Sequence, residues 1–184
     1  MPDFIGRAGE KLDLALREFG IDVAGRIVCD LGSNVGGFVD CLLQRGAAKV
    51  YSVDTSYGTL DWKLRQDTRV VVMERTNAMH VELPERVDLV TIDVGWTRQE
   101  KVVPHAMSLL AGGGRIVSLV KTQYEAAAEE RTDGVVTDGL EETVIARVRK
   151  KLAALGATIE HVIESPYRGQ KGGNREFFFL VGKP

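Results

Sequence analysis

The stretch from Asp30 to Phe38 constrains the fold most, because a short apolar segment leads directly into an acidic residue and a glycine-rich turn. Its sequence is Asp-Leu-Gly-Ser-Asn-Val-Gly-Gly-Phe, and the residues after it have the pattern of a helix. Glycines let a ligand approach the backbone closely, and the first turn of a helix offers unpaired N–H groups. This order of strand, turn and helix predicts a nucleotide-binding corner, with a tight turn that binds no ligand as the alternative.

The glycine spacing favours S-adenosylmethionine over a dinucleotide. The dinucleotide fingerprint G-x-G-x-x-G requires a second glycine where this chain has Asn34, whereas Gly36 and Gly37 follow as an adjacent pair. An aspartate followed by G-x-x-x-G-G suits adenosylmethionine better than a pyrophosphate. A nicotinamide-dependent oxidoreductase is therefore disfavoured.

Apolar segments alternate with helical patterns along the whole chain. Such segments, apolar on both faces, are typical of parallel strands covered by helices. The last strand is expected to run antiparallel, so the pattern predicts an α/β fold with a doubly wound, mostly parallel, seven-stranded sheet, whose ligands bind at the carboxyl ends of the strands. The expected strands are 26–30, 49–53, 70–73, 87–93, 115–121, 158–163 and 177–181, and the main helices are 9–19, 38–44, 59–66, 100–110 and 140–155. The polar segment 124–138 is expected to be a mobile surface lid.

Length and composition favour one soluble domain over residues 1–184. The chain is 44% hydrophobic and 27% charged, and it contains no apolar run long enough to cross a membrane. The N-terminus lacks the apolar region of a secretory signal, so we expect a cytoplasmic protein. Cys29 and Cys41 have no metal-ligand spacing and are expected in the core. A net charge of −2 neither supports nor excludes RNA binding.

Polar residues follow two of the expected strands on the cofactor side. Asp54 ends the second strand 24 residues after Asp30, where such folds place an acid that binds both hydroxyls of an adenosine ribose. Asn77 comes just after the third strand, where its amide would meet an adenine. A solvated strand-end acid and a turn-forming asparagine are the alternatives.

Three further residues are expected together at the same edge of the sheet. Asp93 and Lys121 end the fourth and fifth strands, and a buried lysine requires a partner, which predicts an ion pair between them. A purely structural salt bridge is the alternative. Glu176 opens the antiparallel last strand and falls at the same edge. For Lys11, on the N-terminal helix, spacing alone favours a side chain that faces solvent.

These residues and several segments resemble the FtsJ-type RNA 2′-O-ribose methyltransferases, in particular their TlyA, or hemolysin-A-like, branch. The resemblance covers almost the whole chain. The segments that carry it are Gly6 to Leu12, Asp30 to Phe38, Leu42 to Ala47, Val53-Asp54, Tyr57-Gly58, Glu74 to Asn77, Asp88 to Asp93, Leu119 to Glu125 and Gly173 to Glu176. Members of this branch usually carry an N-terminal S4-type RNA-binding domain, and this chain begins about where the methyltransferase domain would.

The resemblance implies a class I methyltransferase fold and a set of functional residues. The catalytic set would be Lys11, Asp93, Lys121 and Glu176, which replaces the solvent position favoured for Lys11 by a position in the site. The cofactor contacts would be Asp30, Gly32, Ser33, Asn34, Gly36, Gly37, Phe38, Asp54, Asn77 and Asp93. The cofactor would be S-adenosylmethionine and the partner would be RNA, with ribosomal RNA or a ribosomal subunit as the expected target.

The expected chemistry needs a base beside the ribose, because a hydroxyl is a poor nucleophile at neutral pH. Lys121 is the candidate base, with a pKa expected to be lowered by a second cation and by desolvation. No metal is required, and the three histidines lack ligand spacing. RNA contacts would come from two clusters and two aromatic residues: Lys63, Arg65 and Arg69; Arg168, Lys171 and Arg175; and Trp96 and Tyr167. The alternatives are a solvated face for the first cluster and core or rim packing for the two aromatic residues.

The chain departs from the family pattern beside the site. Lys121-Thr-Gln-Tyr-Glu125 stands for Lys-Pro-Gln-Phe-Glu, and Val-Gly-Trp-Thr follows Asp93 in place of Leu-Ser-Phe-Ile. The alternatives are a methyltransferase with a non-RNA substrate and a hemolysin-like protein that binds the cofactor without turnover. The oligomeric state is open.

Overall fold

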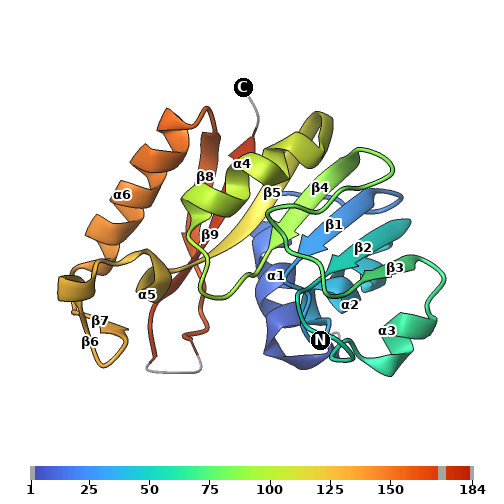
Figure 1. Ribbon diagram of the computed structural model, residues 1–184, viewed down its shortest axis with the longest axis horizontal. Coiled ribbons are helices and arrows are strands. Elements are labelled where there is room, and N and C mark those ends of the chain that lie inside the picture. The colour runs from blue at the N-terminus through green and yellow to red at the C-terminus, as the bar shows by residue number, and fades with distance from the viewer. Residues whose placement is uncertain (1–2, 170–172, 183–184) are drawn as a thin grey trace.

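A seven-stranded sheet runs through the middle of the molecule, with helices on both faces (Figure 1). The computed structural model describes residues 3–169 and 173–182. The strand order is β3-β2-β1-β4-β5-β9-β8. The strands are β1 Ile27–Leu31, β2 Lys49–Val53, β3 Val70–Met73, β4 Val87–Ile92, β5 Leu110–Lys121, β8 Thr158–Glu164 and β9 Glu176–Gly182. The helices are α1 Gly6–Glu18, α2 Gly37–Gln44, α3 Trp62–Gln66, α4 Gln99–Leu109, α5 Thr122–Glu125 and α6 Glu141–Ala154, with the 3-10 turn η1 Ala128–Glu130.

Strand β9 is antiparallel to both of its neighbours, whereas β1 to β5 pair in parallel. The predicted doubly wound sheet with an antiparallel last strand is therefore confirmed. Its carboxyl edge brings together the ends of β1, β2, β4 and β5 and the start of β9. Ligands of open α/β sheets bind at this edge.

The two faces of the sheet bury separate parts of the core. Helices α4 and α6 cover one face and α1 and α2 the other (Figure 1). Side chains alternate between the two faces along β9: Phe177 and Phe179 pack on the face covered by α4 and α6, and Phe178 packs on the face covered by α1 and α2. Burial on both faces explains why the central strands are apolar throughout.

Two segments differ from the expected pattern. Strand β5 begins at Leu110 and includes Gly112 to Gly114, which we expected to separate a helix from a strand starting at Arg115. The segment 124–138 contains α5, η1 and a small hairpin of β6 Arg131–Thr132 and β7 Val135–Val136. Val136 is buried with Ala126 and Val144, so this segment has its own apolar contacts. None of the described helices is long and apolar enough to cross a membrane.

Candidate active site

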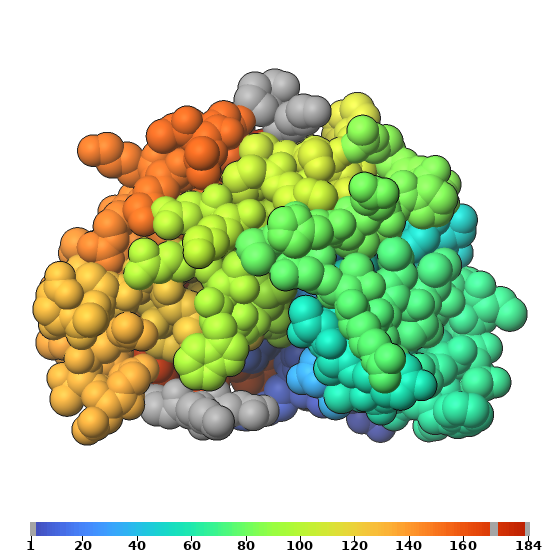
Figure 2. All heavy atoms as spheres, in the orientation of Figure 1, coloured from blue at the N-terminus to red at the C-terminus, as the bar shows by residue number. Residues whose placement is uncertain are grey.

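Two adjoining pockets open at the carboxyl edge of the sheet, where Figure 2 shows a hollow in the surface. The smaller, of about 430 Å³, lies over the ends of β1, β2 and β4, and the larger, of about 610 Å³, lies between α1, α5 and the start of β9. Both volumes are in the range of small-molecule sites. The residues that line both pockets are Asn34, Asp93, Trp96 and Lys121. A ligand in one pocket would therefore meet a ligand in the other beside these four side chains.

Three aspartates lie at the ends of neighbouring strands on the side of the smaller pocket. Asp30 is the fourth residue of β1, and Asp54 and Asp93 directly follow β2 and β4. Asp30 is fully buried; its Oδ1 accepts a hydrogen bond from the Thr91 hydroxyl at 2.6 Å, and its Oδ2 has no hydrogen-bond partner among the described residues. Burial, together with the charges of Asp93 and Asp54, raises the pKa of Asp30 to about 8. This edge of the sheet favours a cationic ligand.

The glycine turn serves two purposes. Gly32 has φ +92°, and a Cβ there would lie 2.6 Å from the Asp93 carbonyl oxygen, so only glycine lets the two loops cross beside the pocket. Asn34 has φ +48°, a left-handed conformation that asparagine tolerates better than most residues. Gly36 and Gly37 line neither pocket. A Cβ on Gly37 would lie 2.8 Å from Ala8 Cβ, so this glycine allows α2 to pack closely against α1.

The other predicted cofactor residues divide between the pocket and the core. Asp54 lines the smaller pocket and accepts hydrogen bonds from the Asn34 and Ser56 N–H groups at 2.8 and 2.7 Å. Asn77 also lines it, and its Oδ1 accepts the Met79 N–H at 2.9 Å.

Five predicted cofactor residues lie outside both pockets. Besides Gly36 and Gly37, these are Asp30, Ser33 and Phe38. Ser33 is buried and accepts a hydrogen bond from Ser52, and Phe38 packs in the core against Phe178. The aromatic side chain that ends the glycine motif therefore serves helix packing in this structure.

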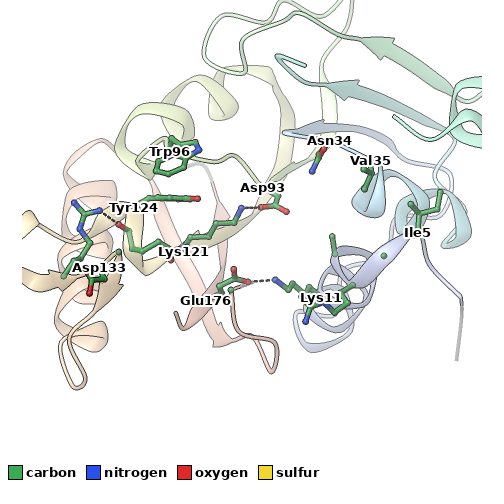
Figure 3. A pocket seen from close by; sticks show the side chains of 17 residues that line it. Ile5, Lys11, Asn34, Val35, Asp93, Trp96, Lys121, Tyr124, Asp133 and Glu176 are labelled. Atoms are coloured by element: carbon green, nitrogen blue, oxygen red, sulfur yellow. Dashed lines mark hydrogen bonds and ion pairs between the residues drawn. The ribbon is translucent and has the colours of Figure 1, made fainter. Parts of the chain in front are cut away.

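Two lysine–carboxylate pairs face each other in the larger pocket (Figure 3). Lys121 Nζ lies 2.5 Å from Asp93 Oδ1, which confirms the predicted ion pair, and Lys11 Nζ lies 2.5 Å from Glu176 Oε2. Lys121 and Glu176 are register partners in β5 and β9. The Lys11 side chain, for which spacing alone favoured solvent, is only 12% exposed because α1 packs over this edge. Each lysine is thus held by a carboxylate from a different element.

The charge balance at Lys121 differs from the expectation. Burial disfavours the ammonium, but the Asp93 carboxylate and then Glu176 outweigh it, so the pKa of Lys121 lies above its ordinary value. The expectation of a lowered pKa was wrong for the protein without ligands, since the nearby charges are anionic. Lys121 is a cation here, and any role as a base requires ligands that offset these carboxylates.

Trp96 and Tyr124 form an aromatic pair at the entrance of the larger pocket (Figure 3). Their ring centroids lie 5.1 Å apart. Trp96 is 86% exposed and has φ +60°, an uncommon conformation for a bulky residue. Tyr167, the other predicted stacking residue, lies outside this pocket and donates a hydrogen bond to Glu10 at 2.6 Å.

Sequence reasoning missed five polar side chains that line the larger pocket. Three of them come from the segment that we expected to be a mobile lid. Asp133 and Gly134 form a turn with φ +51° and +80°, and this Asp-Gly signal of a two-residue hairpin was present in the sequence. The missed polar residues are Arg7, Gln123, Tyr124, Arg131 and Asp133.

Most arginines of the predicted basic clusters are already paired with carboxylates. Arg65 pairs with Glu74 and Arg69 with Asp67. Arg175 contacts both Glu142 and Glu164, and the Arg168 guanidinium donates to the Gly173 carbonyl. Lys171 lies outside the described residues. Within residues 3–169 and 173–182, no group of three His, Cys, Asp or Glu side chains could hold a metal ion.

Comparison with known proteins identifies the family. The chain matches the model of the FtsJ-like methyltransferases over residues 4–183. It is 40% identical over 190 residues to YqxC of Bacillus subtilis, described as a candidate rRNA methyltransferase, covering 98% of this chain and 66% of that protein. It is 39% identical over 183 residues to the 16S/23S rRNA (cytidine-2′-O)-methyltransferase TlyA of Mycobacterium tuberculosis, covering 96% of this chain and 68% of that protein.

A solved structure is also closely similar. A protein of Streptococcus thermophilus described as a candidate hemolysin superposes with a TM-score of 0.94 at 34% identity, covering all of this chain and 68% of the other. This chain thus spans about two thirds of the length of these three proteins. It belongs to the FtsJ-like methyltransferase family.

Proposed function

We propose that this chain transfers a methyl group from S-adenosylmethionine to a ribose 2′-OH of RNA, with ribosomal RNA, free or in a ribosomal subunit, as the substrate. The observation that carries the proposal is the position of Lys121 on both pockets, held by Asp93 and faced by the Lys11–Glu176 pair. A base at this junction can reach a hydroxyl in the larger pocket while a methyl donor occupies the smaller one. The relative TlyA is named for the same reaction.

The smaller pocket suits S-adenosylmethionine in charge and in hydrogen-bonding groups. Asp54 and Asp93 give it a negative potential, which attracts a sulfonium and an ammonium group and repels a pyrophosphate. We assign Asp54 to the ribose hydroxyls, Asn77 to the adenine edge, and Gly32 and Asn34 to the methionine end. The bound cofactor would supply an electrophilic methyl group.

Lys121 is assigned the role of general base. The 2′-oxygen attacks the methyl carbon, the carbon–sulfur bond breaks with its electron pair going to sulfur, and the hydroxyl proton passes to Lys121 Nζ. Only neutral lysine can accept this proton, and the cationic cofactor next to Asp93 would lower the pKa of Lys121 from its raised value. Asp93 holds the Lys121 side chain, and Lys11 with Glu176 would orient the ribose.

Trp96 and Tyr124 are assigned to the base of the target nucleotide. Their rings lie at the pocket entrance, and single-stranded RNA bases commonly stack on aromatic side chains. A hydrogen bond joins the two segments that carry these rings. The Glu125 carboxylate accepts the Gln99 N–H at 2.7 Å, which limits the movement of one ring relative to the other. Stacking at this point would place the attached ribose beside Lys121.

Labelled S-adenosylmethionine and rRNA transcripts test the proposal. We expect the wild-type chain to label the transcript at a ribose, and not to label a transcript with 2′-deoxyribose at the modified position. A second candidate is a protein that binds the cofactor without turnover, favoured by the hemolysin description of the S. thermophilus structure. Tight binding of S-adenosylmethionine by calorimetry, with no methyl transfer to RNA or ribosomal subunits, would support that candidate and exclude ours.

A further inference from the structure

We propose that four exposed side chains beside the two pockets form a docking surface for single-stranded RNA next to the target nucleotide. This aromatic rim consists of Val35, Tyr57, Trp62 and Arg75. The inference rests on the proposed function, because it extends the path of the same RNA beyond the pocket. None of these four residues belongs to the assigned catalytic or cofactor-binding set.

The distribution of exposed apolar side chains first indicates this surface. Among the described residues, the large hydrophobic side chains that are exposed are Val35, Tyr57, Trp62, Val71, Trp96 and Leu155. Four of these six lie around the two pockets. Tyr57 and Trp62 are 70% and 71% exposed, although each could bury a large ring. Exposed apolar groups that gather beside a site mark an interaction surface more often than scattered ones do.

Hydrogen bonds place the rim beside both pockets. Val35 lines the larger pocket, and its carbonyl accepts the Asp61 N–H at 3.1 Å, which holds Trp62 next to it. Tyr57 follows the pocket residue Asp54 by three positions, and the Arg75 N–H donates to the Ser56 carbonyl at 3.1 Å. The rim therefore continues the surface on which the substrate is proposed to lie.

Tyr57 and Arg75 are held in a fixed arrangement. The Arg75 guanidinium carbon lies 4.2 Å from the centre of the Tyr57 ring, and Arg75 has φ +53°, which residues other than glycine rarely adopt. Glu74, which precedes Arg75, connects the two segments that carry these side chains, because its carboxylate accepts the Gly58 N–H at 2.9 Å. The same carboxylate also pairs with Arg65 of α3. The two side chains are thus preorganised although they are exposed.

This combination of groups fits single-stranded RNA. Bases stack on aromatic rings and on guanidinium planes, and an exposed cation beside them binds the phosphate backbone. Arg75 makes no ion pair with the described carboxylates, unlike Arg65 and Arg69 on the same side of the molecule. Duplex RNA could use the charge of Arg75 but would leave the aromatic faces without stacked bases, so the rim should prefer unpaired RNA.

Equilibrium binding of a short single-stranded oligoribonucleotide to the full chain tests the proposal. Tyr57→Ala, Trp62→Ala and Arg75→Ala should each weaken binding by about fivefold or more. Arg75→Ala should also reduce the slope of log affinity against log salt by ~0.7, the value for one phosphate contact. In a Trp96→Phe background Trp62 is the only tryptophan, and its fluorescence should change on addition of single-stranded RNA and less on addition of a duplex.

Arg149→Ala and Leu155→Ala are the matched controls, since both residues are exposed on or directly after α6, away from the pockets. Wild-type RNA affinity in all three rim variants would overturn the proposal. Variants that lose S-adenosylmethionine affinity but keep RNA affinity would also overturn the proposal and would assign the rim to cofactor binding. Variants that change only the oligomeric state would overturn it as well and would assign the rim to protein association.

Methyl transfer by the wild-type chain, measured separately, keeps the two proposals distinct. Transfer to ribose together with unaffected RNA binding in the rim variants overturns the rim alone. Binding of RNA through the rim without transfer to ribose overturns the proposed function alone.

Discussion

Lys121 and Glu176 stand directly opposite each other in the antiparallel strands β5 and β9, yet each forms its ion pair with another residue. Lys121 pairs with Asp93 and Glu176 with Lys11, so the two pairs share one patch of the sheet edge. Glu176 still acts on Lys121 through its charge and raises the pKa of the lysine. The protonation of the proposed base therefore depends on a residue with which it makes no ion pair.

Replacement of Glu176 should move the pH dependence of methyl transfer. Glu176→Gln removes a carboxylate that favours the Lys121 ammonium, so the pKa of Lys121 falls and the neutral base forms at lower pH. The acid limb of the pH profile of kcat should shift to lower pH, whatever happens to the maximal rate. Glu164→Gln, which changes an exposed carboxylate on β8, is the control. An unchanged limb, or a shift to higher pH, would contradict the charge coupling.

Arginine at position 121 should not restore the function of Lys121 as a general base. A guanidinium keeps the positive charge and the pairing with Asp93 but does not give up a proton in proteins. Lys121→Arg should reduce kcat by about 10²- to 10⁴-fold, the usual contribution of a general base, with little effect on S-adenosylmethionine affinity measured by calorimetry. A variant that keeps more than a tenth of the wild-type rate would show that Lys121 acts only through its charge.

Close packing of α1 on α2 should be required for the position of Lys11. In Gly37→Ala the new methyl carbon would lie 2.8 Å from both Ala8 Cβ and the Ile5 carbonyl oxygen, so α1 must shift. We expect a loss of about 1–3 kcal/mol in the free energy of unfolding, typical of overpacking, and a lower kcat with cofactor affinity retained. Gly112→Ala is the matched control, because a Cβ at Gly112 meets no atom within 4 Å. Equal stability and rate in the two variants would count against this packing role.

The strands could be predicted from the sequence because central strands are apolar on both faces and end in polar residues at the ligand edge. Asp93 and Lys121 end adjacent strands, so even their ion pair followed from topology. Lys11 could not be placed in this way. Its side chain reaches the pocket only because α1 packs against α2, a tertiary contact that helical periodicity does not encode.

The charge state of Lys121 and the positions of the motif residues were also beyond sequence reasoning. The carboxylates that raise the pKa of Lys121 come from two other strand ends, and their balance depends on distances. Phe38 has the same place in the motif whether its ring faces the cofactor or the core. The hairpin at Asp133-Gly134 was different, because its turn signal was present and was overlooked.

Asp30 should make stability depend on pH. With a folded pKa of about 8 against an ordinary value near 4, the carboxyl is neutral in both states at low pH, but between about pH 4 and 8 only the unfolded chain gives up the proton. This contribution to stability therefore falls as pH rises through that window, by at most about 1.4 kcal/mol per pH unit, and levels off above pH 8.

Asp30→Asn should lack this decline, because its amide does not ionise and can still accept the Thr91 hydrogen bond. Urea unfolding at pH 5 and pH 8 should show the variant gaining stability relative to wild type as pH rises. The exposed Asp22→Asn provides the control. A constant difference between Asp30→Asn and wild type across this range would argue against a neutral buried carboxyl.

The most direct test of the account is the identity of the methylated nucleoside. Ribosomal RNA incubated with S-adenosylmethionine and either the wild-type chain or Lys121→Ala is digested to nucleosides and analysed by mass spectrometry. The account predicts a 2′-O-methylated nucleoside with the wild-type chain and none above background with Lys121→Ala. A methyl group on a base, or equal ribose methylation by the two proteins, would contradict it.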